Sequence, residues 1–334
     1  MTRRSMHVFT MTGAMAAMVT TAAWAQPAAP PVATDTVTPG IAGVVAAGTK
    51  VEVIKSGFTG TEGPVGLPDG SLIFTETQAN RITRIDKDSN ATTVFLESTN
   101  GSNGLGFDAK GRLISVQTTP GQTKIGVIYP KGSVATITDS FEGKPYGRPN
   151  DLVVAKNGGI YFSEPGPNAT PGQPPAAPPL SPAVYYVSPA GKVARIAEGI
   201  ERPNGIMLSP DEKTLYVNNT NGEYVLAFDV KADGMVGARR NFAKYAKVAT
   251  TPTGGFNSGA DGLAIDAQGR LYAVTAAGIE VFSAQGMALG VIPVSLAPQN
   301  IAFAGADKKT LYIVGRGSAF KVRMLTEGYK GRAK

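Results

Sequence analysis

A hairpin-sized pattern that recurs six times constrains the fold of this chain more than any other feature. Each copy has a polar residue, a short apolar strand, a turn and a second strand. The polar residue precedes the start of the second strand by 10 or 11 residues, and successive copies lie 40 to 56 residues apart. The six polar residues are Glu62, Asn103, Asn150, Asn204, Asp261 and Asn300. A constant hairpin at this period is typical of the blades of a β-propeller.

The repeats predict an all-β, six-bladed β-propeller over residues 51–334. Helical periodicity is essentially missing from this range, which favours one all-β domain. The last blade shows only three strand-like runs, whereas residues 51–55 form a strand-like run that precedes the first hairpin. We therefore expect the N-terminal strand to pair with the C-terminal strand and close the ring, because closure removes exposed sheet edges.

The N-terminal segment has the features of an export signal. Arg3 and Arg4 precede an apolar run over about residues 8–21, and Ala23-Trp24-Ala25 forms a small-residue cleavage motif. The run is too short to span a bilayer, and no later segment is apolar enough to do so. We expect residues 1–25 to be a signal peptide cleaved after Ala25, by the Sec or the twin-arginine route, giving a secreted, periplasmic protein without membrane insertion. The Ala- and Pro-rich residues 26–50 are predicted to form a linker.

Two absences limit the chemistry of the mature chain. There is no cysteine, and the single histidine is His7, inside the predicted signal peptide. This composition excludes disulfides, thiolate chemistry, Ser-His-Asp triads and histidine metal ligands. It favours a hard, oxygen-ligated divalent cation such as Ca²⁺ over zinc, iron or copper. The net charge of +7 is scattered rather than gathered in a basic stripe, so we expect no nucleic-acid partner. We also expect the protein to be a monomer or a weak dimer.

The six polar residues should meet in space. Inner strands of a propeller run in the same direction, so the residues that begin them form a ring at one mouth of the central channel. Four of the six could bind a cation through oxygen atoms, namely Glu62, Asn150, Asn204 and Asp261. Together they would supply two negative charges and four ligands, and water or substrate would complete the six to eight ligands that calcium prefers. Asn103 and Asn300 would remain for substrate contacts. Arg148, two residues before Asn150, would bind a substrate oxygen at the same mouth.

Plainer alternatives stay open for these residues. Asn-Gly and Asp-Gly are common turn dipeptides, although each copy has a separate turn 4 to 7 residues later. Arg148 could instead form a surface salt bridge. Asp151 could hold Asn150 in orientation or contact solvent at a strand edge. The proline-dense insertion at residues 165–182 is either a lid or a disordered spacer.

The motifs around the ring resemble those of the SMP-30/gluconolactonase/luciferin-regenerating-enzyme family, six-bladed propellers that include calcium-dependent lactonases. The matching stretches are Glu62-Gly63-Pro64-Val65, Asn103-Gly104-Leu105, Arg148-Pro149-Asn150-Asp151, Pro203-Asn204-Gly205-Ile206 and Asp261-Gly262-Leu263. The resemblance places the four candidate ligands on the family's metal site and Arg148 at a substrate-contacting position. Two stretches depart from the family. Ser115-Val116-Gln117-Thr118 replaces a Cys-Glu-His stretch of many bacterial members, and Phe162-Ser163-Glu164-Pro165 replaces Phe-Thr-Asp-Pro.

The resemblance implies a calcium-dependent hydrolase that opens a sugar lactone or a related cyclic ester. Asp261, ligated through one oxygen, would act as general base on water. Direct nucleophilic attack by Asp261 is the second candidate mechanism. Two other functions remain open, namely a non-catalytic propeller that binds a ligand or partner around a structural calcium ion, and a phosphotriesterase-like hydrolase using the same site.

Overall fold

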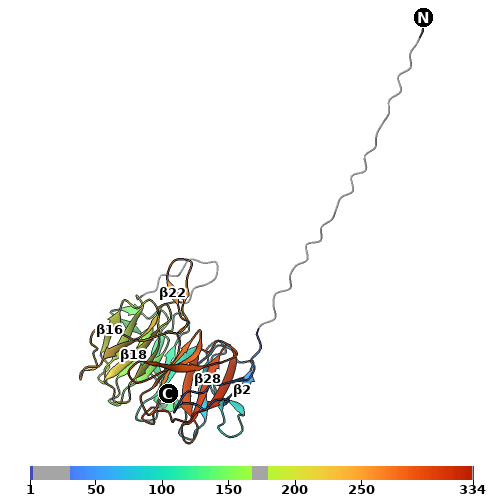
Figure 1. The fold of residues 1–334 in the computed structure, drawn as a ribbon. Coiled ribbons are helices and arrows are strands. Elements are labelled where there is room, and N and C mark those ends of the chain that lie inside the picture. The colour runs from blue at the N-terminus through green and yellow to red at the C-terminus, as the bar shows by residue number, and fades with distance from the viewer. Residues whose placement is uncertain (3–30, 168–179, 333) are drawn as a thin grey trace. The chain divides into compact units, whose positions relative to one another are not determined.

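Six antiparallel sheets form the blades of a propeller in the computed structural model of the protein (Figure 1). The structure describes residues 1–2, 31–167, 180–332 and 334. The predicted signal peptide and most of the proline-dense insertion lie outside the described residues. Residues 32–334 constitute one structural unit, and the predicted six-bladed all-β fold is confirmed. Among the described residues, no helix is both long and apolar enough to cross a bilayer.

Each blade has four strands, with the inner strand first in sequence in blades 1 to 5. Blade 1 contains β3 (Thr61–Gly66), β4 (Leu72–Glu76), β5 (Arg81–Ile85) and β6 (Thr92–Glu97). Blade 2 contains β7 (Ser102–Phe107), β8 (Leu113–Gln117), β9 (Lys124–Tyr129) and β10 (Ala135–Thr138). Blade 3 contains β13 (Leu152–Val154), β14 (Ile160–Glu164), β15 (Ala183–Val187) and β16 (Val193–Glu198).

The remaining blades complete the ring. Blade 4 contains β17 (Pro203–Leu208), β18 (Thr214–Asn219), β19 (Tyr224–Asp229) and β20 (Arg240–Lys244). Blade 5 contains β23 (Leu263–Ile265), β24 (Leu271–Thr275), β25 (Gly278–Phe282) and β26 (Ala288–Ile292). Blade 6 contains β27 (Asn300–Ala304), β28 (Thr310–Gly315), β29 (Ser318–Arg323) and β2 (Lys50–Ser56), with β1 (Thr36–Val37) at its outer edge. Smaller elements are the 3₁₀ turn Lys131–Ser133 and two short hairpins, β11 (Ser140–Phe141) with β12 (Lys144–Pro145), and β21 (Ala249–Thr250) with β22 (Phe256–Asn257).

The ring closes through its two terminal strands. β2 pairs antiparallel with β29, with Val51 opposite Val322, which confirms the predicted closure. The predicted linker over residues 26–50 is wrong in its second half. Thr36 pairs with Val51, and Ile41, Val44 and Val45 are buried in the apolar cluster of blades 5 and 6. These residues lack strand alternation in the sequence, so only the folded blades reveal that they cover an apolar surface.

The apolar core lies between neighbouring blades. Inner strands such as β13 are buried along their whole length, because a blade is covered on both faces. Between blades 2 and 3, for example, Ile114 and Val116 share a buried cluster with Leu152 and Phe162. Each such side chain contributes about 1.5–3 kcal/mol when fully buried. Blade-to-blade packing therefore fixes where each inner strand begins, and so positions the ring residues.

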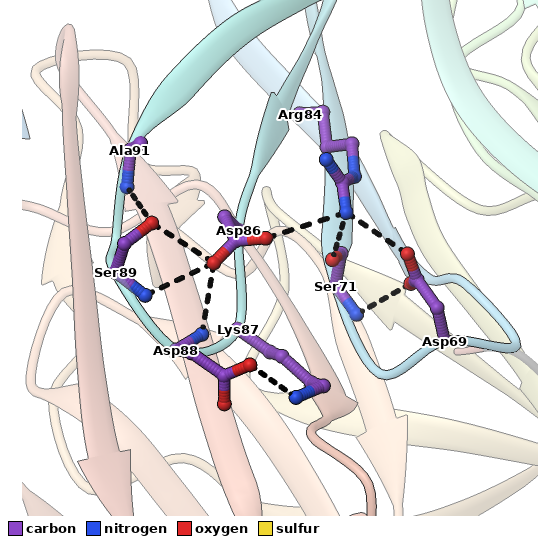
Figure 2. A network of polar contacts seen from close by, with 8 residues as sticks. All are labelled: Asp69, Ser71, Arg84, Asp86, Lys87, Asp88, Ser89 and Ala91. Carbon is purple, nitrogen blue, oxygen red and sulfur yellow. Dashed lines mark hydrogen bonds and ion pairs between the residues drawn. The ribbon is translucent and has the colours of Figure 1, made fainter.

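Ion pairs and hydrogen bonds hold two turns of blade 1 at the end of the blade that lies opposite Glu62. Figure 2 shows Arg84 bridging two turns of blade 1, donating to Asp69 Oδ2 at 2.9 Å and to Asp86 Oδ2 at 3.4 Å. Asp86 Oδ1 also accepts a hydrogen bond from the backbone N–H of Ser89 at 3.0 Å. The turn holding Asp69 follows β3, and it therefore lies at the opposite end of that strand from Glu62. We call the channel opening at these turns the lower mouth, and the opening at the polar residues the upper mouth.

Candidate functional site

The residues that begin the inner strands are joined by backbone hydrogen bonds from blade to blade. The amide of Gly104 donates to Asn150 O at 3.0 Å, and that of Gly205 donates to Asp261 O at 3.1 Å. By the same pattern Gly262 donates to Gln299 O at 2.8 Å. The upper-mouth ring therefore consists of six residues in register: Glu62, Asn103, Asn150, Asn204, Asp261 and Gln299.

Asn300 is thus one position away from the register that the sequence suggested. It corresponds instead to Asp151 and to the glycines that follow the ring residues of the other blades. It still reaches the site, since Asn300 Nδ2 donates to Glu62 Oε2 at 3.3 Å, while Gln299 Nε2 donates to Glu62 Oε1 at 3.2 Å. The position needs a glycine in blade 5, because a Cβ on Gly262 would lie 2.1 Å from Asn300 Oδ1.

Buried oxygen atoms without a partner are concentrated in the ring. Among the described residues, eight buried side-chain N or O atoms have no hydrogen-bond partner. Five of them belong to ring residues: Asn103 Oδ1, Asn103 Nδ2, Asn150 Oδ1, Asn204 Oδ1 and Asp261 Oδ1. A buried polar atom without a partner costs about 1–3 kcal/mol, and a ligand or ion bound at this mouth would offset that cost. Three of the orphaned oxygens belong to residues predicted as cation ligands.

The ring carboxylates have strongly perturbed acidities. Glu62 is only 7% exposed, and burial raises its pKa to about 7 despite the hydrogen bond from Asn300. Weaker influences on this pKa are Asp151, which raises it, and Arg148 and Lys334, which lower it. Burial also raises the pKa of Asp261 well above its usual value, and nearby Glu62 and Asp151 raise it further. Asp261 nevertheless keeps part of its surface exposed to solvent.

These residues fit a hard divalent cation. Four blades contribute two carboxylates and two amide oxygens to the upper mouth, which is a donor set that suits calcium. Burial disfavours the ionised forms of Glu62 and Asp261, and the positive charge of a bound cation would stabilise them. The cation would also give the unpartnered oxygens a partner. The described part of the chain contains no group of three or more His, Cys, Asp or Glu side chains placed to hold a metal ion. A metal site at the ring therefore depends on the amide oxygens as well as the carboxylates.

Asp151 lies next to Asn150 and is completely buried. Its Oδ1 accepts the backbone N–H of Leu152 at 2.9 Å, and its Oδ2 pairs with the ammonium of Lys334. A Cβ on Gly104 would approach Asp151 Oδ1 to 2.6 Å, so the glycine of blade 2 makes room for this carboxylate. Asp151 is therefore not a solvent contact at a strand edge. Its tight fixation is what orientation of the neighbouring Asn150 would require.

A second arginine accompanies Arg148, and the sequence reasoning missed it. Arg202 stands two residues before Asn204, just as Arg148 stands two residues before Asn150. The repeated Arg-Pro-Asn triplet was the available signal. Burial lowers the pKa of Arg202, Arg148 lowers it further and Asp261 raises it, so the three groups lie within electrostatic reach. Both arginines are half-buried.

The backbones of the two arginines are held in the same way. The amide of Arg148 donates to Glu164 Oε1 at 2.9 Å, and the amide of Arg202 donates to Asn219 Oδ1 at 3.1 Å. Glu164 and Asn219 each end the second strand of their blade. Glu164 lies in one of the stretches that depart from the family pattern, and its carboxylate here fixes the segment that carries Arg148.

The chain is thus a closed six-bladed propeller with an oxygen-lined upper mouth and two arginines beside it. Residues 60–316 match the family described as SMP-30/Gluconolactonase/LRE-like region, and the chain belongs to this family. It is 29% identical to a gluconolactonase of Zymomonas mobilis, over 84% of this chain and 83% of the relative. A solved gluconolactonase structure from Xanthomonas campestris superposes with a TM-score of 0.74 at 29% identity, covering 90% of this chain and 99% of that one. Regucalcin from Agrobacterium tumefaciens shares the fold, with a TM-score of 0.66 at 18% identity over 83% and 94% of the two chains.

The raised pKa of Glu62 predicts an unusual dependence of stability on pH. The neutral form of Glu62 is favoured in the folded state, so its stabilisation is fully present below the unfolded pKa of about 4.3 and is lost as pH rises through about 7. The Tm of the cation-free protein should therefore fall between pH 5 and pH 8. Added Ca²⁺ should restore more stability at pH 8 than at pH 5, because it binds the ionised carboxylates. Calorimetry with chelator or with calcium measures both trends, and equal pH profiles in the two conditions would contradict the assignment.

Proposed function

We propose that this protein is an exported hydrolase that depends on a divalent cation, most simply Ca²⁺, and opens a sugar lactone or a related cyclic ester. The observation that carries the proposal is the set of unpartnered buried oxygens of Asn150, Asn204 and Asp261 beside the Glu62 carboxylate. Similarity to gluconolactonases over most of both chains supports the lactone as the class of substrate. Export rests on the sequence of residues 1–25.

The proposed reaction assigns a distinct task to each group. When bound, the cation would polarise the lactone carbonyl and stabilise the negative charge that develops on its oxygen. Asp261 would accept the proton of the attacking water and return it to the ring oxygen as the acyl C–O bond breaks, so that the lactone opens to a hydroxy acid. Arg148 and Arg202 would hold oxygens of the substrate from one side of the mouth, since guanidinium groups donate several hydrogen bonds in a fixed plane.

The direct test is hydrolysis of a panel of aldonolactones by the purified protein, followed by acid release. Turnover should disappear when the cation is removed with EDTA and return when calcium is restored. Turnover that is unaffected by the chelator would overturn the cation dependence. No turnover with any lactone, in a protein whose Tm still rises with calcium, would instead support a non-catalytic propeller with a structural ion.

A further inference from the structure

The C-terminal tail, defined here as residues 325–332 together with Lys334, crosses the lower mouth of the channel. The amide of Tyr329 donates to Ile265 O at 3.1 Å. Arg332 Nη1 donates to Leu208 O and Arg332 Nη2 to Ser209 O, both at 2.9 Å. Ile265 and Leu208 are the last residues of inner strands β23 and β17. The tail is therefore attached to the ends of these strands that face away from the ring.

From this position Lys334 extends its side chain into the interior. The residue is 4% exposed, and its ammonium pairs with Asp151 Oδ2, a carboxylate that is itself fully buried. Asp151 begins the inner segment of blade 3 directly after the ring residue Asn150. Lysine is almost never buried without a partner, and breaking a buried pair leaves an uncompensated charge. The ion pair thus joins the tail at the lower mouth to the residues at the upper mouth.

The pair also contributes to the charge around the ring. Three carboxylates are gathered there, on Glu62, Asp151 and Asp261, and one buried ammonium, on Lys334, opposes them. Counted alone, these four groups carry a net charge of −2, which favours the binding of a cation. Arg148 and Arg202, half-buried at the upper mouth, add positive charge that acts on the same carboxylates, and substitution of Lys334 or Asp151 leaves this contribution in place.

We propose that Lys334 is a built-in counter-ion that sets both the affinity and the valence preference of the cation site. The inference rests on the proposed function, because it concerns the cation that the ring would bind. Lys334 acts through Asp151 and through the field in the channel, and we regard it as a positioning residue rather than a catalytic one. A merely structural role for Lys334 would affect stability and leave the preference between cations unchanged.

Coulomb energies scale with the charge of the ion, and this gives the proposal a quantitative signature. Lys334→Met would change the summed charge of Glu62, Asp151, Asp261 and residue 334 from −2 to −3. We expect Ca²⁺ to bind about 10-fold more tightly and Tb³⁺ about 30-fold more tightly, since the logarithm of the gain should be half as large again for the trivalent ion. Isothermal titration calorimetry of the full chain with each ion measures both affinities without reference to catalysis.

Three further variants make the test specific. Lys330→Met removes a tail charge from a side chain that is 64% exposed, and it should leave both affinities unchanged. Asp151→Asn, with Lys334 retained, should shift them the other way and weaken Ca²⁺ binding about 10-fold. The double variant Asp151→Asn with Lys334→Met restores the summed charge of the natural protein, and it should return both affinities to within about 3-fold of the natural protein.

The outcomes separate the inference from the proposed function. Unchanged affinities in folded Lys334→Met protein, or equal gains for the two ions, would overturn the inference while leaving the cation site in place. If Lys334→Met does not fold, an unchanged Ca²⁺ affinity in Asp151→Asn would overturn it instead. A natural protein that binds neither ion would overturn both proposals. Larger gains for Tb³⁺ than for Ca²⁺, reversed in the double variant, would support the role of Lys334.

Discussion

Replacing Asp261 by asparagine is expected to lower kcat for lactone hydrolysis by about 10²- to 10⁴-fold, the usual contribution of a positioned general base. Asparagine keeps the size of the side chain and one oxygen that can act as a ligand, but it cannot take a proton from water. In the cation-free protein the pKa of Asp261 is raised, first by burial and then by Glu62 and Asp151, which makes the carboxylate a better proton acceptor. Initial rates at saturating calcium measure the effect.

The matched control for this variant is Asp229→Asn, at a blade 4 carboxylate whose side chain is 79% exposed. It should retain natural activity. A folded Asp261→Asn protein with full turnover would rule out Asp261 as base and as nucleophile alike. Single turnover in isotopically labelled water separates these two roles, because only direct attack by Asp261 passes label into its own carboxylate.

The Glu62→Gln variant should bind calcium about 100-fold more weakly than the natural protein, because calcium affinity depends strongly on the charge of the ligands. The same change should stabilise the cation-free protein at pH 8, where the buried Glu62 carboxylate is ionised at a cost. A single substitution thus has opposite effects on ion binding and on apo stability. Calorimetric titration gives the affinity, and scanning calorimetry in chelator gives the Tm.

Glu52→Gln provides the comparison for Glu62→Gln, since Glu52 lies on β2, between β1 and β29, with a side chain 47% exposed. It should change neither the affinity for calcium nor the pH dependence of the Tm. Equal calcium affinities in Glu62→Gln and the natural protein would remove Glu62 from the cation site.

The fold was predictable because its determinants are local. Each hairpin repeats the same short sequence of polar residue, apolar strand and turn, and closure of the ring followed from a last blade that lacked a strand. The pairing of β2 with β29 therefore required no long-range information beyond counting strands. The prediction that inner-strand residues gather at one mouth depended on the same periodicity.

The features that the sequence did not reveal depend on register and on distant contacts. Gln299 replaces Asn300 in the ring because blade-to-blade hydrogen bonds set the register, whereas the sequence pattern was aligned on the residue nearest the apolar run. Arg202 carried a usable signal in its Arg-Pro-Asn triplet. The burial of Lys334 against Asp151 had no signal in the sequence, since a lysine in a short basic tail resembles any solvated surface charge.

Closure of blade 6 by β2 and β29 has a consequence for the newborn chain. β29 follows the first five blades in the sequence, so until it pairs with β2 those blades form an open arc with apolar blade faces uncovered, a state in which chains are prone to aggregate. The upper-mouth ring cannot assemble in that arc, because Glu62 of blade 1 meets Gln299 and Asn300 only after closure. A chain whose ring has not closed would therefore lack the complete ion site. Ion binding would distinguish closed molecules from open ones, which proteases and chaperones can still recognise.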